Sequence, residues 1–132
     1  MANNTLELFH GSEARGILGI INDGAIKPDS QNHVYFTYQF SDALQHGADR
    51  EARASFAFKA IVTVIPGASV SRVAKNGNPL TTLITTTLPL PIKILELYIR
   101  TGTPGEFEIN VVKGEMSIKA RLISLLNNSG RK

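Results

Sequence analysis

The chain has 132 residues, of which 42 % are hydrophobic and 19 % are charged, and its formal net charge is +3. This length and composition predict one globular domain over residues 1–132, with a core that buries about two-thirds of the unfolded surface. The absence of cysteine excludes disulfide scaffolds, thiolate zinc sites, iron–sulfur clusters and thiol nucleophiles.

Charge and hydropathy limit the partners that we expect. The pI near 9.4 is mildly basic. The sequence lacks the stripe of Arg and Lys interleaved with aromatic residues that is typical of a dedicated nucleic-acid module. The sequence contains no run of about 18 apolar residues, so we expect no membrane span. Residues 1–10 lack the pattern of a secretory signal, so we expect a cytoplasmic protein, in the producing cell or in a target cell, and no membrane partner.

Frequent Gly and Pro residues separate short segments, several of them rich in β-branched residues, and this predicts a strand-dominated α+β domain. Alternation of apolar and polar residues marks strands, and apolar residues at helical spacing mark helices. The predicted strands are 6–10, 34–37, 56–65, 80–88 and 106–112. The predicted helices are 13–23, capped by Ser12 and stopped at Gly24, and 42–53, capped by Ser41.

Other segments are less determined. The pattern over 69–79 indicates a loop, and 92–99 suits a strand or a short helix. Residues 116–125 suit a final strand or a helix, and 127–132 are expected to be a frayed tail.

Three blocks along the chain carry a resemblance. They are Leu8-Phe9-His10-Gly11-Ser12 with Gly16-Ile17-Leu18 and Gly24 to Pro28 behind it, then Val34-Tyr35-Phe36-Thr37, then Glu106-Phe107-Glu108-Ile109 with Gly114. In this order they resemble the His–Tyr–Glu branch of the ADP-ribosyltransferase superfamily, which includes diphtheria-like toxins, poly(ADP-ribose) polymerases and small rifampicin-inactivating transferases. The resemblance implies a split β-sandwich of two small antiparallel sheets with two or so helices, which holds NAD as its substrate in a cleft.

The resemblance also implies roles for residues near the amino terminus. His10 matches the family's ribose-binding histidine, Gly11 matches the backbone position that holds the carboxamide, and Ser12 follows them. Tyr35 matches the tyrosine that stacks on nicotinamide, with Tyr38 as the fallback, and His46 takes the place of a second stacking aromatic. An imidazole offers less ring contact than a larger aromatic.

The resemblance places the catalytic acid near the carboxyl end. Glu106 and Glu108 are two residues apart, so both carboxylates face the same side of a strand. Related toxins imply that Glu108 is catalytic and Glu106 assists, whereas polymerase-like relatives favour Glu106 before Phe107. Rifampicin transferases carry their acid in the loop after the third strand, but 66–75 here contains no acidic residue. The stretch Gly77-Asn78-Pro79 nevertheless resembles a Gly-Asn-Pro stretch of the rifampicin transferases.

The implied function is an NAD-dependent mono-ADP-ribosyltransferase, a bacterial toxin or effector domain that modifies a macromolecule and releases nicotinamide. Its acceptor would be a protein or a nucleic acid, and a neutralising immunity or antitoxin protein is an expected partner. Two alternatives remain open: an NAD glycohydrolase on the same site, and a degenerate binding module of this fold. The three histidines are too scattered for a zinc signature, so no metal is expected.

Overall fold

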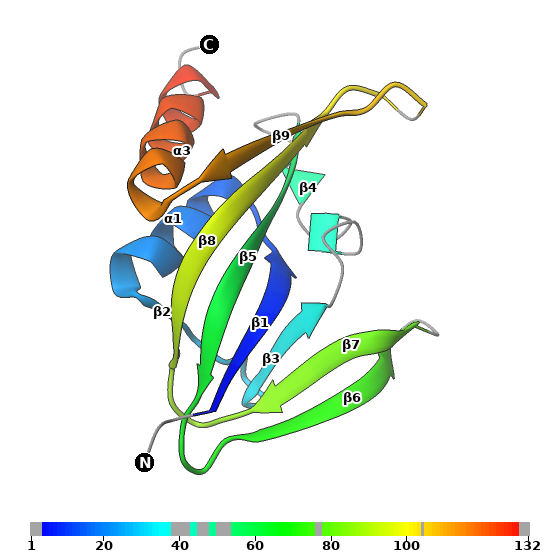
Figure 1. The fold of residues 1–132 in the computed structure, drawn as a ribbon, viewed down its shortest axis with the longest axis vertical. Coiled ribbons are helices and arrows are strands. Elements are labelled where there is room, and N and C mark those ends of the chain that lie inside the picture. Colours follow the sequence, from blue (N-terminus) through cyan, green and yellow to red (C-terminus); the bar gives the residue numbers. More distant parts are fainter. Residues whose placement is uncertain are drawn as a thin grey trace.

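The computed structural model describes residues 4–37, 43–44, 48–49, 54–75, 78–103 and 105–129 (Figure 1). Within the described residues the long helices are α1 (Ala14–Asp23) and α3 (Glu115–Ser129), and residues 43–44 are also helical. The strands are β1 (Asn4–Gly11), β2 (Ala25–Ile26), β3 (His33–Thr37), β4 (Ala48–Asp49), β5 (Ala54–Val64), β6 (Ser69–Lys75), β7 (Asn78–Thr85), β8 (Leu90–Thr101) and β9 (Glu108–Lys113).

The described strands form one sheet in the order β2-β8-β5-β1-β3-β7-β6, with β4 paired to β5 and β9 paired to β8. All of its registered pairs are antiparallel. Strands β1 and β5 stay in register from Asn4↔Val64 to Gly11↔Ala57. Strands β1 and β3 instead share only the pair Phe9↔Thr37, so the sheet opens between them.

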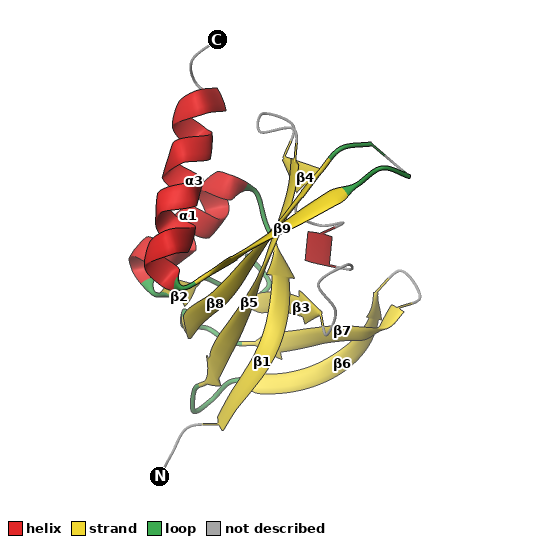
Figure 2. Cartoon of the chain, turned by 45° about the horizontal axis from the view of Figure 1, so that its top comes forward, coloured by secondary structure: helices red, strands yellow, loops and turns green. Residues whose placement is uncertain are grey.

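Both helices lie on one face of the sheet (Figure 2). Their apolar residues meet the inward-facing side chains of β5 and β8 in the main core, where Phe58, Leu97, Ile118 and Leu122 are fully buried. Alternation places Phe58 on this face, and four-residue spacing places Ile118 and Leu122 there. Among the described residues, neither helix is both long and apolar enough to span a membrane.

Helix α1 ends where the sequence predicts. Gly24 adopts a left-handed conformation with φ 67°, and its N–H donates to the carbonyls of Ile20 and Ile21. Glycine adopts this conformation without a Cβ clash. The beginning of the helix differs from the prediction, because Glu13 and not Ser12 is the N-cap and makes no side-chain capping bond.

The structure settles or corrects several sequence predictions. The expected pair of small sheets is one nine-stranded sheet within the described residues. The segment 69–79, expected to be a loop, contains β6 and the start of β7, because the two segments pair with each other. Residues 92–99 belong to a strand and 116–125 to a helix, and that helix continues through 127–129, where a frayed tail was expected.

The predicted helix over 42–53 is also corrected where it can be compared. Residues 43–44 are helical, but Ala48 and Asp49 pair with Ser55 and Ala54 as strand β4. The other residues of that prediction lie outside the described part of the chain.

Candidate functional site

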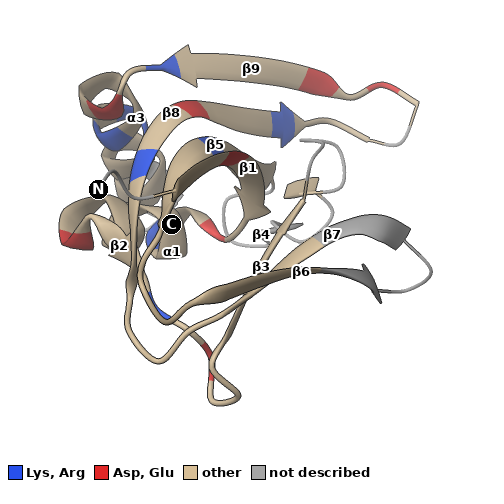
Figure 3. Cartoon of the chain, turned by 60° about the horizontal axis from the view of Figure 1, so that its bottom comes forward, with Lys and Arg blue, Asp and Glu red and all other residues tan. Residues whose placement is uncertain are grey.

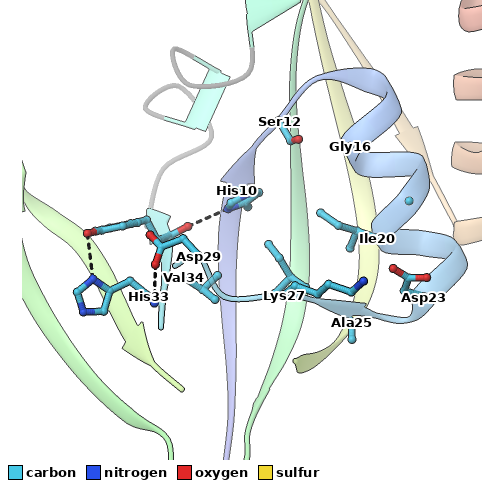
Figure 4. Close-up of a pocket in the computed structure, with 13 residues that line it drawn as sticks. His10, Ser12, Gly16, Ile20, Asp23, Ala25, Lys27, Asp29, His33 and Val34 are labelled. Atoms are coloured by element: carbon cyan, nitrogen blue, oxygen red, sulfur yellow. Dashed lines mark hydrogen bonds between the residues drawn. The ribbon is translucent and has the colours of Figure 1, made fainter. Parts of the chain in front are cut away.

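A cavity of about 450 Å³ opens beside the end of β1, between α1 and the beginning of β3 (Figure 4). Its lining comes from 10–12, 16–27 and 29–35, and the residues are His10, Ser12, Gly16, Gly19, Ile20, Asp23, Ala25, Ile26, Lys27, Asp29, His33, Val34 and Tyr35. The cavity lies where β1 and β3 stop pairing. Its volume is in the range of small-molecule sites.

His10 is fixed at the wall between β1 and β3. Its Nδ1 lies 2.8 Å from the backbone oxygen of Tyr35, and its ring packs 5.5 Å from Phe36 and 5.4 Å from Phe58. A carbonyl oxygen only accepts, so Nδ1 donates the proton of this bond. In the neutral ring Nε2 is then the nitrogen that accepts a hydrogen bond.

Tyr35 and His33 supply two further rings from β3. The Tyr35 hydroxyl lies 3.4 Å from Nδ1 of His33, and the rings meet edge to face with their centroids 5.9 Å apart. Phe36, between Tyr35 and Thr37, points into the core and is fully buried. Because the Phe36 ring packs against His10, the alternation of a strand places the Tyr35 side chain on the opposite face of β3, and the backbone oxygen of Tyr35 bonds to His10 at the cavity wall.

The face of α1 toward the cavity carries two glycines. A Cβ added at Gly16 would clash with Oγ of Ser12, whereas a Cβ at Gly19 would meet nothing within 4 Å. Gly16 thus makes room for the Ser12 hydroxyl, and Gly19 leaves space open to a ligand.

Three charged residues line the exposed rim. Lys27 and Asp23 point toward one another at one end (Figure 4). Asp29 lies at the other end, where its Oδ1 accepts the backbone N–H groups of Gln31 and His33, each at 2.9 Å. Asp29, His33 and Lys27 were not predicted from the sequence as site residues. The signal for Asp29 was its position between Pro28 and a strand, where Asp side chains fold back on the backbone.

The structure brings together part of the site implied by the resemblance. His10, Ser12 and Tyr35 all line this cavity. Gly11, between His10 and Ser12 in the chain, pairs with Ala57 of β5 and does not line the cavity. Tyr38 and His46 lie outside the described residues.

Glu106 and Glu108 are not brought to the cavity. Glu108 pairs with Thr101 at the beginning of β9, whereas the β8 residue aligned with His10 through Phe58 is Leu97. Strand spacings place Glu108 about 14 Å from His10 across the sheet and about 13 Å along it. Glu106 precedes β9, and its N–H donates to the carbonyl of Thr103. Figure 3 shows the acidic start of β9 far from β3.

Comparisons with known proteins identify no relative of this chain. No protein-family model matches the chain, and no curated protein or solved structure is significantly similar to it. Among the described residues, no group of three or more His, Asp or Glu side chains is placed to hold a metal ion. A functional assignment therefore depends on the cavity and its residues.

Proposed function

We propose that this protein binds NAD in the cavity between β1, α1 and β3 and transfers its ADP-ribose group to an acceptor, releasing nicotinamide. The observation that carries the proposal is that His10 and Tyr35, 25 positions apart, both line one cavity, where the imidazole of His10 bonds to the backbone oxygen of Tyr35. The short pairing between β1 and β3 leaves space for a ligand at this point of the sheet.

The lining chemistry supports a nicotinamide riboside as the bound group. The imidazole of His10 at the cavity wall suits a hydrogen bond with a ribose hydroxyl, and the stacking of Tyr35 on nicotinamide rests on the resemblance. The bare helix face at Gly19 admits a ligand close to the backbone. Lys27 at the rim would meet the negative charge of the pyrophosphate.

We infer that the acceptor is a macromolecule, protein or nucleic acid. Gly16, Gly19, Lys27 and Asp29 are exposed at the rim, so an acceptor too large to enter the cavity can reach its mouth. A toxin or effector role with a neutralising partner protein rests on the resemblance alone and is part of the same proposal.

A second candidate is a module that binds NAD without turning it over. It is favoured by the position of Glu106 and Glu108, because neither carboxylate lines the cavity that holds His10 and Tyr35.

The test measures NAD binding by saturation-transfer NMR and nicotinamide release by chromatography, for the wild type, Gly19→Leu and Asn22→Leu. The leucine at 19 fills open space in the cavity, so we expect binding and release to fall about tenfold or more. Asn22 is on the same helix, exposed and outside the lining, and its variant should behave as wild type.

The same experiment separates the alternatives. A mass increase on lysate macromolecules supports transfer, whereas free ADP-ribose without such an adduct supports a glycohydrolase. Binding without nicotinamide release supports the second candidate. Absence of NAD binding by the wild type would refute the proposed function.

A further inference from the structure

The cavity contains two carboxylates that the resemblance does not assign, Asp23 and Asp29. Cleavage of the bond between ribose and nicotinamide builds positive charge on the ribose ring, and a carboxylate beside the ring stabilises that charge. Since β5 and β8 lie between β1 and the strand β9 that Glu108 begins and Glu106 precedes, a carboxylate of the cavity itself is better placed for this role.

Asp29 is held in position before any ligand binds. Its Oδ1 accepts two backbone N–H groups, those of Gln31 and His33. Its own N–H donates to the carbonyl of His33 at 3.0 Å, and its carbonyl accepts from Asn32 at 2.9 Å. A charged group that is already oriented needs no reorganisation in the transition state, which is where electrostatic catalysis gains most.

The same strand positions Asp29 and His10. Strand β3 binds the carboxylate of Asp29 through the N–H of His33, and it binds the imidazole of His10 through the carbonyl of Tyr35. Figure 4 shows Asp29 beside these residues at one end of the cavity. The carboxylate, the imidazole and the Tyr35 ring are thus attached to one short, rigid segment.

Asp23 lies in a different setting. It is the last residue of α1, and its side chain and that of Lys27 point toward one another at the other end of the cavity (Figure 4). Asp29 is the carboxylate that backbone N–H groups hold in a fixed orientation, and on this ground it is the better candidate of the two.

We propose that Asp29 is the catalytic carboxylate of the NAD-cleaving reaction, an inference that rests on the proposed function. The bond between ribose C1′ and the nicotinamide nitrogen breaks, and both its electrons leave with neutral nicotinamide. The positive charge left on the ribose faces the Asp29 carboxylate. An O–H or N–H group of the acceptor, or water in hydrolysis, forms the new bond to C1′. Its proton passes to Asp29 and then to solvent.

The decisive variant is Asp29→Asn, because an asparagine oxygen still accepts the N–H groups of Gln31 and His33 and so keeps the turn. We expect nicotinamide release to fall about 100-fold, as for loss of one oriented electrostatic group. NAD affinity should stay within about threefold, since the carboxylate acts mainly in the transition state. Thermal unfolding checks that the fold is kept.

Two matched variants accompany it, Glu108→Gln and Glu115→Gln. Glu115 is exposed at the beginning of α3, away from the cavity, and its variant controls for the loss of one negative charge. Both variants should release nicotinamide at the wild-type rate.

The inference is overturned if Asp29→Asn releases nicotinamide at the wild-type rate, if it loses affinity and release equally, or if Glu108→Gln shows the 100-fold loss instead. These outcomes leave the proposed function intact. A wild type that releases no nicotinamide rejects the catalytic part of the proposed function, and the role of Asp29 with it.

Discussion

Gly16 and Gly19 occupy the interior of a helix, where glycine costs about 1 kcal/mol relative to alanine. Both are exposed and face the cavity. The ten-residue helix α1 is therefore less stable with these two glycines on one face than it would be with alanines. Departures of this kind from local propensity are expected where a site needs space, and the surroundings of the two glycines show that the space serves different purposes.

Alanine at these two positions should therefore give different results. Gly19→Ala should raise the free energy of unfolding by about 0.5–1 kcal/mol, since its Cβ meets nothing and the helix gains propensity. Gly16→Ala should gain less, because the Ser12 hydroxyl must rotate away from the added methyl group. Urea unfolding of both variants measures the difference. Equal gains would show that Ser12 and Gly16 do not constrain one another.

At the scale of the elements, β1, β5 and β8 carry a polar cluster on the face away from the helices. Nζ of Lys59 lies 2.6 Å from Oε1 of Glu7 and 3.8 Å from a carboxylate oxygen of Glu96. The hydroxyl of Tyr98 donates to Glu96 at 3.3 Å. Burial, together with the negative charge of Glu96, raises the pKa of Tyr98 above its ordinary 10.0. Hydrogen bonding to Glu7 raises the pKa of Lys59.

These shifts predict how stability falls at high pH. A group whose pKa is higher in the folded state contributes its full stability below the unfolded pKa and loses it as the pH rises through the folded pKa. The free energy of unfolding should thus decline above about pH 10 as unfolded tyrosine ionises. In Tyr98→Phe the decline should be shallower, with the part due to Lys59 retained. Urea midpoints at several pH values from about 9 to 11 measure both slopes, and equal slopes would contradict the assignment to Tyr98.

Elements with a dense pattern were predictable from sequence. Phe56, Phe58 and Val62 alternate on a face that is buried as expected, and Gly24 ends α1 where predicted. The β6 strand was missed because the sequence Gly77-Asn78-Pro79 is typical of a loop, whereas the pairing of β6 with β7 becomes visible only in the structure. The last segment was ambiguous because Met116, Ile118 and Leu122 also fit an alternating pattern, although Met116 is 87 % exposed and the other two are buried.

At the scale of the whole molecule, the half of the site built from neighbouring segments was predictable and the other half was not. His10 and Tyr35 lie on β1 and β3, which pair with one another and are separated in the chain only by α1 and β2, and Ser12 directly follows β1. The position of Glu108 instead depends on strand order, which a single sequence does not specify. The structure places β5 and β8 between β1 and β9. The resemblance therefore predicted the type of residue for the proposed acid, but the strand order decides whether that residue reaches the cavity.

A map of NAD binding over the whole chain tests this division of the molecule. We expect amide chemical shifts to change at the end of β1, along α1 and at the beginning of β3, for example at Ser12, Gly19 and Asp29, because these residues line one cavity. Glu108 and Val111 on β9 should stay unchanged, since they lie beyond β5 and β8. The Gly19→Leu variant serves as the control, because filling the cavity should remove the changes at β1 and β3 together. Shifts centred on β9 would instead place the ligand beside the glutamates, and the cavity would then have to be abandoned as the NAD site.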